Sequence, residues 1–171
     1  MARLLKLFAL VLALGFSGCA GYKLGPTNGQ VPGAKSVQVN PFLNETMQVQ
    51  LGDDVTDQLR KQIQKDGTFR LQTSSDDSDI ILSGVLISYV RIPLSFQPND
   101  ALTVADYSVR VLAQVTAKER STGKVLLNQP VSGTTLVIVG GNLDSAERQA
   151  RPLLAADLAK NVTAILAEGS W

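Results

Sequence analysis

One segment of the chain alternates apolar and polar residues over most of its length, and this constrains the fold more than any other feature. In Leu102–Glu119 an apolar residue occupies every second position from Tyr107 to Ala117, which is the period of a β-strand. The apolar set is Tyr107, Val109, Val111, Ala113, Val115 and Ala117, and the polar set is Asp106, Ser108, Arg110, Gln114, Thr116 and Lys118. We therefore expect a long strand with one packed face and one wetter face.

The segments on either side of this strand predict further strands. Ile80–Ile92 is rich in β-branched and aliphatic residues, which is typical of a central strand, and Pro93 is expected to end it. Gly123 favours a hairpin turn, and the strand that follows it contains Pro130. Because proline has no N–H group, it indicates an edge strand or a bulge. Two earlier pieces complete the set, a first strand within Ser36–Phe42 and a short extended piece at Phe69–Gln72.

Two segments have the period of an amphipathic helix. In Asn44–Gly67 an apolar residue recurs at every fourth position, with acidic residues near the start and basic residues near the end, as the helix dipole favours. The apolar stripe is Leu51, Val55, Leu59 and Ile63. A second helix is expected to be capped by Asp144 or Ser145 and to reach about Ala167, with Pro152 either starting it or kinking its first turn.

The predicted order of elements is β-α-β-β-β-α, which gives an α+β fold with a mixed four-stranded sheet. The first β-α-β crossover is expected to be right-handed with parallel strands, and the later strands are expected to form an antiparallel meander. Each helix has one apolar face, so we expect both helices to pack on the same face of the sheet. The sequence contains no internal repeat, and we predict a single domain over residues 36–171.

The N-terminus has the pattern of a secretory signal that ends at the only cysteine of the chain. Two basic residues precede the apolar run Leu7–Phe16, which is shorter than the about 20 residues that a membrane-spanning helix needs. Small residues stand directly before Cys19, and this matches the bacterial lipoprotein signal. The match implies cleavage after Gly18, a diacylglycerol thioether on Cys19 and acylation of the new amino terminus, for example with palmitate. Ala20 favours the outer membrane over retention in the inner membrane.

The mature chain is then expected to consist of a lipidated tether, residues 19–35, followed by the domain. The tether is rich in Gly and Pro, and fully extended it reaches about 55 Å at roughly 3.4 Å per residue. Removal of residues 1–18, the signal peptide, takes Arg3 and Lys6 from the 16 Lys and Arg residues and leaves 14 against 15 Asp and Glu. This near-neutral balance argues against nucleic-acid binding, which relies on clustered positive charge.

Composition also disfavours several kinds of chemistry. The chain has no histidine, so it cannot form a Ser-His-Asp or Cys-His site and lacks the commonest transition-metal ligand. A second cysteine is missing, which excludes an intrachain disulfide. The acidic run Ser74–Asp79 lacks the glycine and the distal glutamate of a calcium-binding loop. We therefore expect no catalytic site, no cofactor and no metal site.

Several segments, taken in order, resemble the LptE family of lipopolysaccharide-assembly lipoproteins. Cys19–Leu24 is similar to the opening of the family, where glycine, an aromatic residue, a basic or polar residue and leucine follow the lipidated cysteine. Ser36–Thr46 resembles the strand and the "PFxNxT" segment of more distant members. Further similar segments, which correspond to the central strands, the hairpin and the last helix, are Tyr89, Ala105–Tyr107, Thr122–Val125 and Asp157–Ala159.

This resemblance implies a binding role without turnover chemistry. LptE proteins lie at the inner leaflet of the outer membrane, plug the lumen of the large β-barrel LptD, help that barrel to fold and assist the insertion of lipopolysaccharide into the outer leaflet. The resemblance therefore implies a lipid-anchored protein on the periplasmic face of a Gram-negative outer membrane. Its implied partners are an LptD-like barrel and lipopolysaccharide itself.

The resemblance also indicates where contacts are made. The connection Arg91–Leu102 is expected to be a loop, and in the family this connection can point into the barrel and is linked to lipopolysaccharide binding. Some members have a basic residue after the aromatic residue of this loop, where this chain has Gln97, so other cations are expected to meet lipid A phosphates. The candidate contact residues are Arg91, Leu94, Phe96, Gln97, Arg110 and Lys124. The arginines are equally compatible with ordinary solvated positions on a sheet.

Two other function classes fit part of the sequence. Val37–Leu71 also resembles periplasmic lipoproteins that activate peptidoglycan synthases, and the related domain of curli-type secretion systems. The short tether favours a partner at the membrane over one deep in the cell wall. A third class is an enzyme that acts on envelope glycans through paired carboxylates, but no motif in the sequence places such a pair.

Overall fold

The computed structural model describes residues 31–73 and 78–169. The signal peptide, Cys19, most of the tether and part of the acidic run lie outside the described residues. Predictions about the lipid anchor therefore stay predictions.

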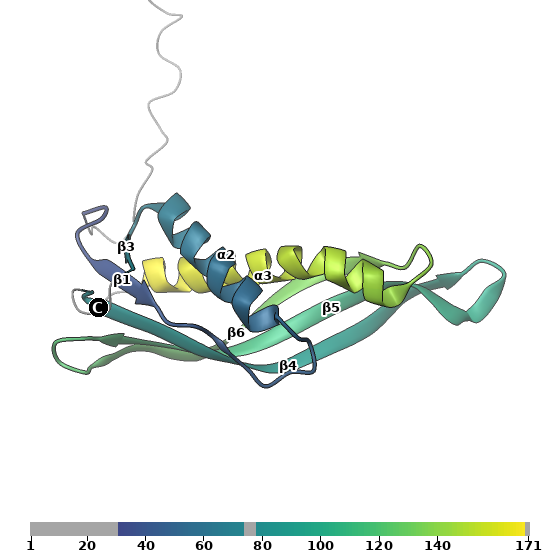
Figure 1. Cartoon of the computed structure of the whole chain (residues 1–171), viewed down its shortest axis with the longest axis horizontal. Coiled ribbons are helices and arrows are strands. Elements are labelled where there is room, and N and C mark those ends of the chain that lie inside the picture. Colours follow the sequence, from purple (N-terminus) through teal and green to yellow (C-terminus); the bar gives the residue numbers. More distant parts are fainter. Residues whose placement is uncertain (1–30, 74–77, 170–171) are drawn as a thin grey trace, which may run out of the picture.

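A mixed sheet forms one layer of the domain (Figure 1). The strand order is β3-β1-β4-β5-β6, and β2 pairs with β4 beside this path. The strands are β1 (Ser36–Val39), β2 (Leu43–Asn44), β3 (Arg70–Gln72), β4 (Ile80–Gln97), β5 (Asp100–Glu119) and β6 (Val125–Ile138). β1 is parallel to β3 and β4, whereas β4, β5 and β6 form an antiparallel meander. The predicted α+β class is confirmed, but the sheet has six strands instead of four because β2 and β3 add short strands.

Both described helices cover the same face of the sheet, as predicted (Figure 1). Helix α2 (Leu51–Asp66) begins later than predicted, because residues 45–50 form a loop that is held by hydrogen bonds, including one from the Asn44 side chain. In this loop the Asn44 side-chain amide donates to the Gln48 carbonyl at 2.6 Å, and Gln50 is left-handed with φ of 68°. Gly67 caps the end of the helix in the left-handed conformation, and its N–H donates to the Ile63 carbonyl.

Helix α3 (Leu143–Glu168) is capped by Asn142, one position before the helix and different from both predicted caps. The Asn142 side chain accepts a hydrogen bond from the Ser145 N–H at 3.2 Å, so neither Asp144 nor Ser145 is the capping residue. Because this cap sets the start of the helix early, Pro152 lies inside α3 and not in its first turn. Pro152 is exposed, so its ring faces away from the core.

The core lies between the helices and the covered face of the sheet. The alternating residues of β5 from Val109 to Ala117 and the predicted stripe of α2 are all buried. Close packing requires glycine at two sheet positions. A Cβ on Gly84 would lie 2.3 Å from the Phe42 ring, and one on Gly133 would lie 2.6 Å from the Leu158 nitrogen of α3. Gly84 and Gly133 therefore let a ring and a helix pack directly against the sheet.

A β-bulge divides β4 into two parts that present opposite residues to the helices. Up to Leu86 the even-numbered residues of β4 are buried, and between Leu86 and Ser88 the register with β5 shifts by one residue. A one-residue bulge exchanges the two faces of a strand. Beyond it the odd-numbered residues Tyr89 and Arg91 therefore lie on the face that carries the helices.

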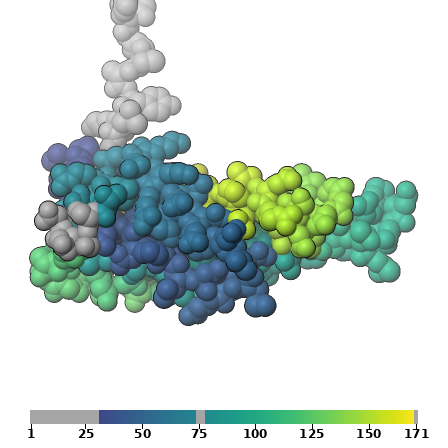
Figure 2. All heavy atoms as spheres, in the orientation of Figure 1, coloured from purple at the N-terminus to yellow at the C-terminus, as the bar shows by residue number. Residues whose placement is uncertain are grey.

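The prediction that Arg91–Leu102 forms a loop is wrong, because most of this segment is β-strand. β4 continues through Pro93 to Gln97, and β5 begins at Asp100, so the connection is a tight hairpin. Proline is tolerated because β2 pairs with β4 only at Val85 and Leu86, which leaves the distal part of β4 without a neighbour on that side. The hairpin projects beyond the helices as a narrow ribbon (Figures 1 and 2).

Candidate binding surfaces

The structure distributes the six predicted contact residues over four places, and Arg91 lies apart from the other five, on the helix-covered face of β4. Leu94, Phe96 and Gln97 lie on the projecting hairpin, Arg110 lies in the middle of β5, and Lys124 lies in the connection from β5 to β6. The 20 residues of β5 separate its two ends by about 65 Å at roughly 3.3 Å per residue. Lys124 therefore cannot share one small-ligand site with Phe96.

Arg91 lies on the helix-covered face and belongs to a polar cluster around Glu147. The Glu147 carboxylate is only 6% exposed and accepts hydrogen bonds from both Nε and Nη2 of Arg91, the latter at 2.9 Å. It also accepts from the Tyr89 hydroxyl at 3.0 Å and from the Gln48 amide at 3.2 Å. The Glu147 cluster, as we call these four residues, ties β4, the start of α3 and the loop before α2 together.

The electrostatics of the Glu147 cluster are those of a satisfied ion pair. Hydrogen bonds from Arg91 hold the pKa of Glu147 below its usual range, although burial opposes this shift. Burial raises the pKa of Tyr89, and the neighbouring Glu147 carboxylate raises it further, so the hydroxyl stays protonated and donates. The Arg91 guanidinium also lies 5.6 Å from the centre of the Tyr89 ring. The positive charge of Arg91 is thus already matched inside the domain.

Arg110 lies on the opposite, uncovered face and is exposed. In the strand register it stands between Val90 of β4 and Thr134 of β6. Within residues 31–73 and 78–169, no hydrogen bond or ion pair is found for its guanidinium. The adjacent strand positions on this face carry the half-exposed residues Ile92 and Leu136. We call Val90, Ile92, Arg110 and Leu136 the Arg110 face, which combines a free cation with apolar side chains.

The tip of the hairpin adds further exposed apolar side chains. Leu94 and Phe96 are about half exposed, and Leu102 is almost fully exposed. The Ser95 hydroxyl donates to Asp106 across the hairpin, which fixes the two strands at the base of the tip. The predicted apolar contacts at Leu94 and Phe96 are therefore accessible, but they are carried by strand and not by loop.

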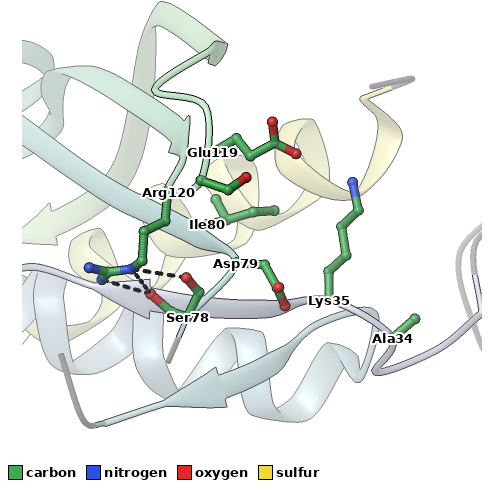
Figure 3. Close-up of a pocket in the computed structure, with 8 residues that line it drawn as sticks. Ala34, Lys35, Ser78, Asp79, Ile80, Glu119 and Arg120 are labelled. Carbon is green, nitrogen blue, oxygen red and sulfur yellow. Dashed lines mark hydrogen bonds between the residues drawn. The ribbon is translucent and has the colours of Figure 1, made fainter. Parts of the chain in front are cut away.

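A hollow of about 230 Å³ lies at the other end of the sheet, where the chain enters β1. Asp79 accepts from the N–H and the hydroxyl of Ser36, each at 2.7 Å, and the backbone hydrogen bond is the main reason that the pKa of Asp79 is lowered. Arg120 donates to the carbonyl and hydroxyl of Ser78, and Lys35 points away from that contact (Figure 3). These polar groups fasten the first strand to the sheet, so the hollow has a structural explanation.

Sequence reasoning missed part of the uncovered face and the partner of Arg91. Leu136 and Ile138 are exposed on β6, and only the alternation within that strand could have indicated them. Glu147 was missed because nothing in the sequence links it to residues more than fifty positions earlier. The described part of the chain contains no group of three or more metal-ligating side chains. Neither described helix combines the length and the apolar character that a membrane crossing requires.

Comparisons with known proteins agree on fold and family. The profile of the LptE family, described as lipopolysaccharide-assembly, matches residues 34–165. Among curated proteins, none matches the chain significantly in sequence. A protein from Xanthomonas campestris is similar in structure, with a TM-score of 0.57, 8% identity and coverage of 85% of this chain and 91% of that one. A minor lipoprotein from Acinetobacter baumannii has a TM-score of 0.50, 14% identity and coverage of 78% and 92%.

Proposed function

The chain belongs to the LptE family of lipopolysaccharide-assembly lipoproteins, and we propose that it assists lipopolysaccharide export by plugging and stabilising an LptD-like barrel. The observation that carries the proposal is the family match over residues 34–165, which spans nearly the whole folded domain. The family consists of envelope lipoproteins that are not enzymes and bind no cofactor. A rigid sheet with a projecting ribbon suits a role in binding and support.

The proposed location is the periplasmic face of the outer membrane, with a lipid on Cys19. The tether of residues 19–35 then holds the domain near the membrane, since it reaches about 55 Å at most. Replacing Cys19 with alanine is expected to release the protein from membranes that are washed at high salt. As a matched control, Ala20→Asp keeps the cysteine and is expected to move the protein to the inner membrane instead. A Cys19→Ala protein that stays in the outer-membrane fraction would show that the lipid is not the main anchor.

The proposed ligand is lipopolysaccharide, and the Arg110 face is the better of the two arginine positions. Arg110 has a free guanidinium among apolar side chains, which suits a ligand with phosphates and acyl chains. Arg91 is held by Glu147 on the other face, so a phosphate would have to compete with a buried carboxylate. Leu94, Phe96 and Gln97 at the hairpin tip are proposed to contact the barrel or the ligand.

Affinity purification of the full-length protein from native outer membranes tests the proposed partner. Recovery of a large barrel protein is the expected result. Recovery of a penicillin-binding protein instead would support the alternative hypothesis that the chain activates a peptidoglycan synthase. A third result, a homo-oligomeric pore, would favour a curli-type secretion role. Both rival outcomes contradict the proposal.

A further inference from the structure

Among the described strands, free edges lie at β2, β3, the distal part of β4 and β6, and the first three are poor sites for adding another strand; β2 has only two residues. β3 forms one edge and is only three residues long. The distal part of β4 contains Pro93 and several register shifts, which disrupt a regular row of donors and acceptors. Short strands, prolines and bulges are the usual means by which proteins prevent pairing at an edge. β6 is different, because it is an edge strand of 14 residues whose pairing with β5 is regular from Leu127 onward.

The middle of the β6 edge, from Pro130 to Thr134, is blocked against pairing, and we call it the sealed section; α3 supplies two of the blocking contacts. Pro130 has no N–H group, as expected for an edge position. Two residues further on, the outward Ser132 carbonyl accepts from the Asn161 side chain at 2.9 Å. The outward Thr134 N–H donates to the Asp157 carboxylate at 2.8 Å. Asp157 and Asn161 are four residues apart, so they lie in one row along the helix.

Gly133 makes this sealing possible. It sits between the two sealed positions and faces α3, where a Cβ would come within 3 Å of Leu158. The missing side chain lets the helix approach β6 closely, so the short side chains of Asp157 and Asn161 reach the strand edge. The seal is therefore a result of helix packing and not of the strand sequence alone.

The seal stops before the end of the strand. In a β-strand the backbone N–H and C=O groups of every second residue point to the same side. Leu136 and Ile138 are two and four residues beyond Thr134, so their N–H and C=O groups also point outward, away from β5. Within the described residues, neither position has a hydrogen-bond partner at this edge. Asp157 and Asn161 form a row along α3, and the next residue of that row, one turn before Asp157, is Leu153. The Leu153 side chain has no polar group that could hydrogen-bond the backbone of β6. Leu136, Ile138 and Leu153 are 50%, 66% and 63% exposed.

We propose that Leu136–Ile138, the open edge, accepts an extended apolar strand of a partner protein by strand addition. Unpaired backbone N–H and C=O groups are matched best by another polypeptide backbone. Side chains of the added strand would alternate between Leu136 and Ile138 on one face of the sheet and the side of α3 that carries Leu153 on the other. An added strand with apolar residues on both faces therefore fits this site.

A second copy of this chain is a poorer occupant than a different protein. Another copy would bring its own sealed section, so pairing between two β6 edges would stop at Leu136 and Ile138. A different strand can continue past Ile138, beside the exposed residues Gly140 and Gly141. This inference does not depend on the partner being an LptD-like barrel, because it concerns only how a strand is bound.

Photo-crosslinking in native membranes tests the open edge. The full-length chain carries Ile138→benzoylphenylalanine, and a second-site Leu136→Pro removes the outward N–H without breaking the bonds to β5. We expect one protein adduct, which Leu136→Pro reduces by about tenfold or more because a backbone hydrogen bond is lost and the ring blocks the strand. The matched control Asn128→Pro removes an outward N–H at the other end of β6 and should leave the adduct unchanged.

Several results would overturn the inference. These are no protein adduct, an adduct of two copies of this chain, a lipid adduct alone, or an adduct that Leu136→Pro leaves at full yield. Leu153→Glu gives an independent arm if Leu136→Pro fails to fold, because Leu153 is exposed and its replacement should not disturb the core. It should also reduce the adduct severalfold, and an unchanged yield contradicts the proposal. An adduct with a protein that is not a β-barrel would contradict the proposed function, but it would still support strand addition at the open edge.

Discussion

The two halves of β4 differ in what covers them, although both are rich in aliphatic residues. Before the bulge, Leu82 is fully buried beneath the helices, whereas beyond it Ile92 is 42% exposed and Phe96 is 51% exposed. Both halves pair with β5, but only the first half also pairs with β1 and β2 on its other side. The helices end before the hairpin does (Figure 1). The first half therefore supplies stability, and the second half keeps apolar surface available for binding.

The largest expected effect tests this difference directly. Leu82→Ala should lower the free energy of unfolding by about 2–5 kcal/mol, because it leaves a cavity under the helices. Ile92→Ala on the uncovered face should change it by less than about 1 kcal/mol. Urea unfolding followed by circular dichroism measures both. Equal losses in the two variants would mean that something covers the distal half in solution.

The Glu147 cluster marks the boundary between the two halves, and its removal comes next in size. Glu147→Ala leaves Arg91 and Tyr89 without their acceptor and should lower the free energy of unfolding by about 1–3 kcal/mol. Asp144→Ala, which removes an exposed acid in the first turn of α3, is the control and should cost less than about 1 kcal/mol. A result in which both variants cost the same would show that the cluster adds nothing beyond the helix dipole.

The pH dependence of stability gives a separate view of the same cluster. The pKa of Glu147 is lowered in the folded protein, so its contribution is present above the unfolded value of about 4.3 and disappears as the pH falls through the folded pKa. In the Glu147→Gln variant the side chain at this position has no ionisable group. The stability advantage of the natural protein over this variant should therefore be constant at neutral pH and shrink below about pH 4. Urea midpoints from pH 7 to pH 3 measure it, and a constant gap contradicts the assignment.

The two parts of the β6 edge provide the next comparison. Asp157→Ala together with Asn161→Ala should cost about 1–2 kcal/mol, since two hydrogen bonds to the strand are lost. The variant should also self-associate at concentrations where the natural chain is monomeric, because the exposed edge becomes long and regular. Lys160→Ala, on the solvent side of the same helix, is the control. Analytical ultracentrifugation that shows no change in mass would mean that these side chains do not protect the edge.

The smallest effect on stability, but a clear one on binding, is expected at the Arg110 face. Arg110→Glu should leave the free energy of unfolding within about 0.5 kcal/mol and weaken lipopolysaccharide binding severalfold. The double reversal of Arg91 and Arg110 should weaken binding as well, but Arg91→Glu also breaks the Glu147 cluster. Lys124→Glu, at the far end of β5, serves as the charge-matched control. Direct binding that is unchanged in Arg110→Glu would remove this residue from the site.

Local sequence patterns predicted which helices and strands form better than they predicted where each one begins and ends. The period of two in β5 and the period of four in α2 depend only on residues close in sequence, and both buried faces follow from them. The limits depended on neighbours that the pattern does not contain. Pro93 would end a central strand, but it lies where β4 has lost its second neighbour, so the strand continues.

The two arginines of the candidate site also differ in a way that local sequence does not predict. Both were predicted contacts, and in the sequence nothing distinguishes a free guanidinium from a paired one. The bulge between Leu86 and Ser88 exchanges the faces of β4 and turns Arg91 toward Glu147, while Arg110 stays on the uncovered face. A one-residue shift in register therefore decides which cation remains available.

The sequence by itself determined the order of the elements, their buried faces and the lipoprotein-like N-terminus, because each depends on short-range periodicity or on a compact motif. Only the tertiary structure decided how far the helices cover the sheet, which arginine is paired and where the β6 edge stays open. Those features arise from contacts between residues that are distant in the chain, such as Thr134 with Asp157 and Arg91 with Glu147. Hydrogen-bonding groups and charges are satisfied by whatever the fold brings near them, and that proximity is a property of packing.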